Sequence, residues 1–234
     1  MKNIFILFIL CSSFYSCIPE KVRINPDKRV LISGKILFDN PTSIPVATFG
    51  AIDGNVNSSP YHKLGFSKTS LSGNINFISL DTRNGDLAVI INPEYEEGYR
   101  EDYAILNFID LADDHAVHID LGNINLPLKK EFTISFENTS GTTNELRYNI
   151  NYQNQKLYYL IIDGNVSGEV PENYQLRNSR AILGSHSISD GITSVKLFTV
   201  EDSEITIAYT LGIEDPREIL IPVTSQTSSH VFEY

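Results

Sequence analysis

Alternation of apolar and polar residues recurs along most of the chain. In residues 30–38 the even-numbered positions are apolar apart from Gly34, and in residues 146–152 Leu146, Tyr148, Ile150 and Tyr152 fall on one side. A period of two is typical of a strand with one buried face. Both stretches are therefore predicted to be half-buried β-strands.

Further strands are predicted at short intervals, separated by turn-forming Asn, Asp, Gly, Ser and Pro. They cover residues 44–49, 71–81, 86–92, 102–110, 117–121, 132–138, 156–163, 180–183, 194–200, 204–211, 218–223 and 230–233. The apolar run at 86–92 suits a central strand. Only Gln153–Asn154–Gln155 separates 146–152 from 156–163, so we predict that these two strands form a hairpin.

The strand pattern and the composition together predict an all-β protein. Tyr and Phe number 12 each, Trp is absent, and helical periodicity is not seen after residue 16. We expect two β-sandwich domains, residues 30–129 and residues 130–234. The second domain has the short, regularly spaced strands of an immunoglobulin-like sandwich but lacks the Cys and Trp hallmarks of true immunoglobulin domains.

The first 16 residues have the features of a cleaved signal peptide. Lys2 precedes an apolar run at 4–10, and serines interrupt the end of the segment. The run is about half of the roughly 20 apolar residues that a membrane-spanning helix needs. Residues 17–29, with two prolines and mixed charges, are predicted to be a tether.

Phe14-Tyr15-Ser16-Cys17 resembles the lipobox of bacterial lipoproteins. The resemblance implies that Cys17 becomes the acylated first residue of the mature protein, with palmitate and other acyl chains as its membrane anchor. An ordinary signal peptide with a chance cysteine, or an uncleaved anchor, are the alternatives. Because Ile18 follows the cysteine rather than Asp, the outer membrane is favoured. Whether the domains face the periplasm or the cell surface is left open.

Residues 30–128 resemble the carboxypeptidase regulatory-like family of transthyretin-like β-sandwiches. The matching pieces, in order, are ISGKILFDN, SIPVATFGAID, KTSLSGNINFISLD, GDLAVIINPEYE and HIDLGNINLPL. Residues 54–66 and 94–102 are longer than the family's pattern, and Ser43 stands where a glycine is common. The resemblance implies a small sandwich with a scaffold role, and it brings no catalytic residues.

Charge and cysteine content exclude several classes of function. The formal net charge is −11, and the chain has no extended basic cluster, so nucleic acid is not an expected partner. Both cysteines lie within the first 17 residues. The predicted mature domains therefore contain no disulfide, no thiolate metal site and no cysteine nucleophile.

Two acidic segments are weak candidates for binding sites. Residues 94–102 contain five acids, and Tyr95, Tyr99 and Tyr103 lie in and beside them, where they could contact a ligand. Asp110, Asp113 and Asp114 could supply oxygen ligands to calcium. In both places a solvated loop, flexible in the case of 94–102, is the alternative interpretation. We predict no cofactor.

The five histidines do not predict a metal site. His115 and His118 are three residues apart, which places them on opposite faces of a strand. His62, His186 and His230 are interpreted as isolated surface residues.

The sequence therefore favours a non-enzymatic lipoprotein that acts as a binding or scaffold module through loops at the ends of its sandwiches. Its partners would be membrane lipid, through Cys17, and an unidentified glycan, envelope protein or host surface. One alternative is a hydrolase that uses carboxylates from residues 94–114. Another is an accessory subunit of an envelope assembly or export complex.

Overall fold

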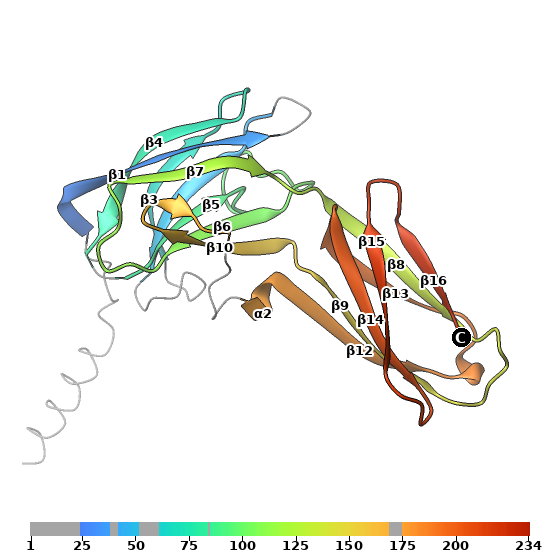
Figure 1. Cartoon of the computed structure of the whole chain (residues 1–234). Coiled ribbons are helices and arrows are strands. Elements are labelled where there is room, and N and C mark those ends of the chain that lie inside the picture. The colour runs from blue at the N-terminus through green and yellow to red at the C-terminus, as the bar shows by residue number, and fades with distance from the viewer. Residues whose placement is uncertain (1–23, 38–41, 52–60, 84, 169–174) are drawn as a thin grey trace, which may run out of the picture.

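The computed structural model describes residues 24–37, 42–51, 61–83, 85–168 and 175–234. Almost all of its regular structure is β, which confirms the predicted fold class, and Figure 1 shows two β-sandwiches. The only helices among the described residues are α2 (Gln175–Asn178) and the 3₁₀ turn η3 (Ile188–Asp190). No helix in these ranges is long and apolar enough to cross a membrane.

The first sandwich is formed by one curled nine-stranded sheet with the order β3-β2-β5-β6-β10-β11-β7-β1-β4. Its strands are β1 (Ile24–Leu37), β2 (Pro45–Ala51), β3 (Tyr61–Lys68), β4 (Asn74–Thr82), β5 (Leu87–Ile91), β6 (Ile105–Asp110), β7 (His118–Asn125), β10 (Lys156–Ile162) and β11 (Asn165–Val166). Strand β5 lies between β2 and β6, as expected for a central strand. Strand β3 was not predicted.

The two ends of this sheet meet, which encloses the main core. A Cβ atom on Gly65 of β3 would lie 3.1 Å from Cα of Ser79 in β4, so a residue without a side chain is needed there. Val30, Ile32 and Ile36 of β1 point into the core and are essentially fully buried. The alternation predicted for residues 30–36 is therefore confirmed.

The second sandwich packs a four-stranded sheet on a three-stranded one. The four-stranded sheet has the order β12 (Ser179–His186), β9 (Leu146–Gln153), β14 (Ser203–Leu211), β15 (Arg217–Val223). The three-stranded sheet has the order β13 (Thr193–Val200), β8 (Lys129–Glu137), β16 (Ser229–Glu233). Phe132 and Phe136 of β8 fill the space between them together with Leu146 and Ile150 of β9. The stacked rings of Phe136 and Tyr148, with centroids 4.2 Å apart, join the two layers.

The predicted hairpin of residues 146–152 and 156–163 is wrong. Strand β9 pairs with β12 and β14, whereas β10 runs parallel to β6 in the first sheet. Leu157 and Ile161 of β10 lie in the main core, and Tyr158 lies in a second apolar cluster on the other face of the sheet. A strand with apolar side chains on both faces is stable only between two buried layers, which the first sheet provides. Residues 156–166 of the predicted second domain thus belong to the first sandwich.

Part of the predicted tether is also a strand. β1 begins at Ile24, whose register partner is Thr82 of β4, so residues 24–29 are not a tether. The signal peptide of residues 1–16, Cys17 and residues 18–23 lie outside the described residues.

Candidate functional site

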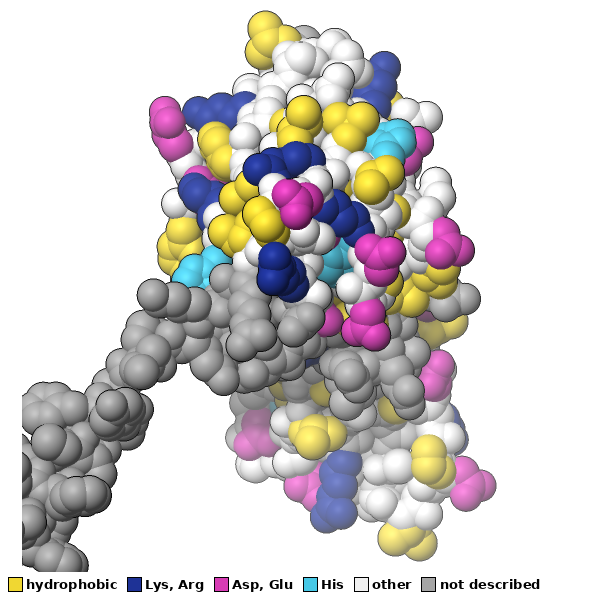
Figure 2. Space-filling view, turned by 90° about the vertical axis from the view of Figure 1, so that its left-hand side faces the viewer, with side chains coloured by type: hydrophobic (Ala, Val, Ile, Leu, Met, Phe, Trp, Pro, Cys, Tyr) yellow, Lys and Arg dark blue, Asp and Glu magenta, His cyan; other side chains and the backbone are white. Residues whose placement is uncertain are grey.

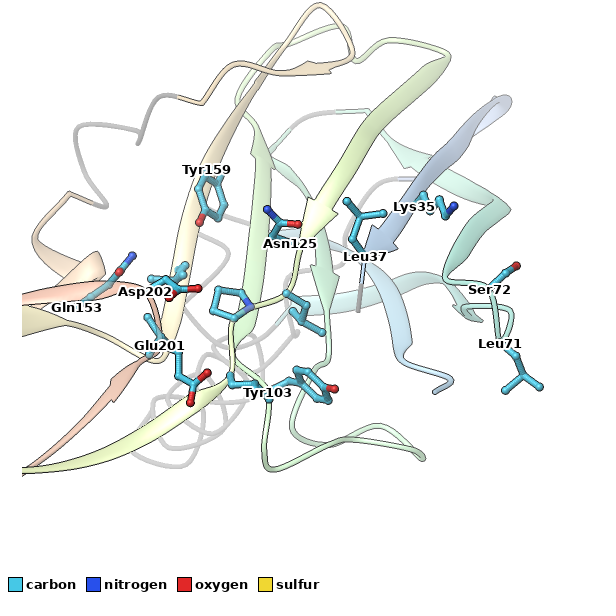
Figure 3. A pocket seen from close by; sticks show the side chains of 15 residues that line it. Lys35, Leu37, Leu71, Ser72, Tyr103, Asn125, Gln153, Tyr159, Glu201 and Asp202 are labelled. Atoms are coloured by element: carbon cyan, nitrogen blue, oxygen red, sulfur yellow. The ribbon is translucent and has the colours of Figure 1, made fainter. Parts of the chain in front are cut away.

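A groove of about 940 Å³ lies where the two sandwiches meet (Figure 3). Its volume is in the range of clefts that hold ligands. Residues from distant parts of the chain line it, among them Tyr103, Asn125, Gln153, Tyr159, Glu201 and Asp202. We call it the inter-sandwich groove.

The first sandwich contributes aromatic and amide groups to the groove. Tyr159 projects from β10 with its ring stacked on Phe108 at a centroid distance of 5.4 Å. Burial raises the pKa of Tyr159, so its hydroxyl stays a neutral hydrogen-bond donor at physiological pH. Asn125 ends β7, and the ring of Tyr103 has the Arg100 guanidinium carbon 5.9 Å from its centroid.

The second sandwich contributes carboxylates, which lie in the turn between β13 and β14. The backbone N–H of Glu201 donates to the carbonyl of Leu128 at 2.8 Å, which ties the turn to the crossover between the sandwiches. The Glu201 carboxylate lies 3.5 Å from Nζ of Lys130. Asp202 has a φ of 56°, and its exposed carboxylate has no partner among the described residues. The groove therefore presents one free negative charge beside aromatic rings and amides.

A shallower hollow of about 490 Å³ lies next to Tyr99 and Glu94. Nζ of Lys129 donates to the Tyr99 hydroxyl at 2.7 Å and lies 5.2 Å from the centroid of its ring. Glu94 is paired with Lys156 at 2.9 Å. Since these polar groups already satisfy one another, this hollow is the weaker candidate.

The structure separates the three tyrosines that were predicted to contact a ligand. Tyr103 lines the inter-sandwich groove and Tyr99 the shallower hollow, whereas Tyr95 is 87% exposed and lines neither. The loop that carries them is hydrogen-bonded to Asn92. The Asn92 side chain donates to the carbonyls of Arg100 and Tyr103 and accepts from the Arg100 N–H at 2.8 Å. These bonds hold Arg100 and Tyr103 to Asn92, and the flexibility of residues 94–102 stays a prediction.

Four acids of residues 94–102 are each paired with a different cation. The pairs are Glu94–Lys156, Glu96–Lys63, Glu97–Lys68 and Asp102–Arg100. Glycoside hydrolysis needs two carboxylates that act together on one bond, one of them protonated. Carboxylates held apart by separate cations do not support the hydrolase alternative.

Asp110, Asp113 and Asp114 do not form the predicted calcium site. Asp110 is buried, Asp113 is exposed, and the exposed Asp114 carboxylate accepts from Nζ of Lys28 at 2.6 Å. Within the described ranges no group of three or more His, Cys, Asp or Glu side chains is placed to hold a metal ion.

A buried polar cluster at one end of the first sandwich was missed by sequence reasoning. His115 Nδ1 lies 2.7 Å from Asp81, and Nζ of Lys28 contacts Asp81, Asp114 and the carbonyl of His115. Burial raises the pKa of Asp86 and of Asp110, with charge repulsion from Asp110 as a further cause for Asp86 and from Asp81 for Asp110. Aspartates at the ends of apolar strands were the only sequence signal for it.

His115 and His118 differ in burial, but His115 lies before β7 and not, as was predicted, in the same strand as His118. His115 is buried, while His118 is exposed on the outer face of β7. There His118 Nε2 lies 2.7 Å from the hydroxyl of Ser33, which also donates to Asp120 at 3.3 Å. In a catalytic triad the carboxylate orients the histidine rather than the serine, so this surface trio lacks that arrangement.

The prediction that His186 lies on the surface is wrong. Its side chain is almost completely buried, with Nδ1 at 2.6 Å from the hydroxyl of Tyr234 and Nε2 at 2.7 Å from the carbonyl of Gly191. A fully bonded histidine of this kind fixes the C-terminus and is not available as a ligand.

The face of the first sandwich shown in Figure 2 offers no comparable site. Hydrophobic side chains there are interrupted by basic and acidic ones in the part that the structure describes. Scattered exposed apolar residues are normal for a protein surface. The inter-sandwich groove is therefore the best candidate.

No family model matches the chain, so the resemblance to the carboxypeptidase regulatory-like family stays a prediction. No curated protein matches it.

Some solved structures are similar to this chain, with low sequence identity and low TM-scores. The TIE protein of Bacillus anthracis is 13% identical with a TM-score of 0.29, over 88% of this chain and 34% of that one. A streptococcal ancillary pilin is 10% identical with a TM-score of 0.28, over 89% and 63%. The tip fimbrial protein of Porphyromonas gingivalis is 9% identical with a TM-score of 0.28, over 84% and 82%. The chain thus spans about a third of the length of the first of these and less than two thirds of the second. Likeness of this degree says nothing about function.

Proposed function

We propose that this protein is a non-enzymatic binding module that holds its ligand in the inter-sandwich groove. The observation that carries the proposal is the composition of the groove. The free carboxylate of Asp202 lies in one space with the side chains of Tyr103, Tyr159 and Asn125. Such a set can recognise a ligand by hydrogen bonds, stacking and charge.

The chemistry of the described groups also supports binding rather than catalysis. Four of the five acids of residues 94–102 are neutralised by separate lysines and an arginine, and no carboxylate orients the histidine of the Ser33–His118 pair. The two buried carboxylates with raised pKa values, Asp86 and Asp110, are not among the residues that line the groove. Among the described residues that line the groove, none forms an activated nucleophile or an acid–base pair of the usual kind.

We further propose that acylated Cys17 anchors the module in the outer membrane. Six residues lie between Cys17 and Ile24, where β1 begins. The seven Cα–Cα steps from Cys17 to Ile24 span at most about 25 Å in a fully extended chain. The first sandwich would therefore lie close to the membrane surface.

Crosslinking from the groove in living cells tests the proposal. A photocrosslinking amino acid is placed at Tyr103 and, as the matched control, at Ile78 on the exposed outer face of the first sandwich. We expect a light-dependent adduct from position 103 that is absent from position 78. Equal adducts from both positions, or none from position 103, would contradict a ligand in the groove.

A further inference from the structure

Beyond Asp120, β7 is paired on one side only. Its neighbour β1 pairs with residues 118–120 and 123–125 of β7, with an irregularity between these two stretches. On the other side β11 has a single register pair with it, Asn165 with Asp120, supported by the bond from the Asp120 N–H to the Gly164 carbonyl at 2.7 Å. Residues 122–125 of β7 have no strand beside them on that side among the described residues.

The backbone groups of Asn123 and Asn125 point toward this open side. The N–H of Leu31 donates to the carbonyl of Val117, on the side of β1 where β7 lies. The N–H of Ile36 donates to the carbonyl of Gly73, on the side where β4 lies. The backbone N–H and C=O groups of the odd-numbered residues of β1 therefore point toward β7. In a pair of parallel strands, a residue whose backbone N–H and C=O point toward the adjacent strand bonds to the two residues that flank its register partner there. The N–H and C=O of the register partner itself point away from the first strand. Lys35 is in register with Asn123 and Leu37 with Asn125. No hydrogen bond to these outward N–H and C=O groups is found in the described part of the chain.

The strand edge across the gap is covered instead. The N–H of Tyr158 in β10 donates to Oδ1 of Asn178 at 2.8 Å, and Nδ2 of Asn178 donates to the Tyr158 carbonyl at 3.0 Å. The Leu160 carbonyl accepts from the Ser167 N–H at 2.9 Å. Proteins usually cover or block exposed strand edges, because a free edge pairs with other chains. The β10 edge follows that rule and the β7 edge does not.

We propose that the free edge of β7 binds an extended segment of a partner protein, which adds to the sheet as a further strand within the inter-sandwich groove. The inference rests on the proposed function and names the ligand class for the same site. Asn125 lines the groove, as Figure 3 shows, so a segment bonded to its backbone lies inside it. Strand addition draws its affinity from main-chain hydrogen bonds and its specificity from alternate side chains.

The charges of the groove specify the segment further. Asp202 offers a free carboxylate on one side, and exposed Lys35 of β1 lies beyond β7, in register with Asn123 (Figure 3). Leu37 and Leu128 leave apolar surface between the polar groups. The best match is therefore a strand with apolar residues at alternate positions, basic residues toward Asp202 and acidic residues toward Lys35.

The probe is a blocked eight-residue peptide in which valine alternates with two lysines in one half and two glutamates in the other. We expect it to bind the full-length protein and to slow amide hydrogen exchange at Asn123 and Asn125 by about tenfold or more. The same peptide with methylated backbone nitrogens keeps every side chain but loses its N–H donors. It should not bind.

Two variants at one position separate the backbone from the side chain. Asn125→Pro removes the outward N–H and leaves the bonds to β1, and it should weaken binding about tenfold. Asn125→Ala keeps the N–H and should bind nearly as the parent does. The methylated peptide keeps the test decisive should Asn125→Pro fail to fold.

Equal binding of the methylated and unmethylated peptides, or unchanged exchange at Asn123 and Asn125 with saturating peptide, would overturn the inference. So would a failure of the probe to bind. A crosslink from Tyr103 to a glycan, without peptide binding, would also overturn it and leave the proposed function standing. The absence of a cellular crosslink from Tyr103 would overturn the proposed function and, with it, the inference, even if the peptide protects Asn125.

Discussion

Nδ1 of His115 lies 2.7 Å from a carboxylate oxygen of Asp81, and both side chains are almost completely buried. The same oxygen accepts the N–H of Thr82 at 2.9 Å, and Nζ of Lys28 lies 3.5 Å from the other one. Lys28 comes from the start of β1 and Asp81 from the end of β4, so the cluster joins the first residues of β1 to the sheet. Stability of this end of the first sandwich therefore depends on a few polar contacts.

Replacing Asp81 with Ala should destabilise the protein by about 3 kcal/mol, because His115 and Lys28 would each lose a buried partner. The free energy of unfolding from urea titration measures the effect. Asp114→Ala is the matched control, since it removes the exposed carboxylate that Lys28 also binds. A much smaller loss is expected there. Similar losses in the two variants would show that burial of Asp81 is not the cause.

Asp86→Asn should stabilise the protein by about 1 kcal/mol at pH 7. One carboxylate oxygen of Asp86 is buried without a hydrogen-bond partner among the described residues, and burial raises the pKa of this group. The pKa of Asp86 in the folded state lies above the ordinary value of 3.8. The stability that the protonated carboxyl contributes is therefore fully present below pH 3.8. It is lost as pH rises through the raised pKa.

The gain from Asp86→Asn should therefore shrink as the pH is lowered toward 4. Unfolding titrations of the parent and the variant at both pH values measure this. Asp113→Asn, at an exposed position, should leave stability unchanged at either pH. A variant less stable than the parent at pH 7 would mean that the Asp86 carboxylate is stabilised by contacts other than those described.

Asn178→Ala should cost about 2 kcal/mol, because the side chain makes two hydrogen bonds to the backbone of Tyr158. Amide exchange at Tyr158 should accelerate as the edge of β10 becomes free. The exposed neighbour Ser179 provides the control, and Ser179→Ala should change neither quantity. Unchanged exchange at Tyr158 in Asn178→Ala would contradict the role given to this amide.

Cys17→Ala should move the protein from the membrane fraction to the soluble fraction, since it removes the predicted lipid attachment site. Incorporation of labelled palmitate should be lost at the same time. Cys11→Ala should remain membrane-bound and labelled. Membrane retention of Cys17→Ala would refute lipid anchoring at this cysteine.

The sequence alone determined most of the strands. Where one face is buried and the other is solvated, the alternation is visible in the residues themselves, as in Val30, Ile32 and Ile36 or in Leu146 and Ile150. The number and spacing of such stretches predicted two domains that divide at residue 129, whereas residues 156–166 lie in the first sandwich. Tyr103, which was proposed as a ligand contact for its place in an acidic segment, lines the groove; its contact with a ligand stays a prediction.

Only the tertiary structure decided which strands pair. Residues 156–162 carry apolar side chains on both faces. Their sequence pattern is therefore equally compatible with a hairpin with 146–152 and with the observed pairing beside β6. Strand pairing uses backbone groups that are the same in every residue, and the choice between partners is made by burial of both faces at once. The groove and the free edge of β7 follow from that choice. Asn125, Tyr159 and Asp202 become neighbours only because β10 crosses back into the first sandwich, which no local pattern records.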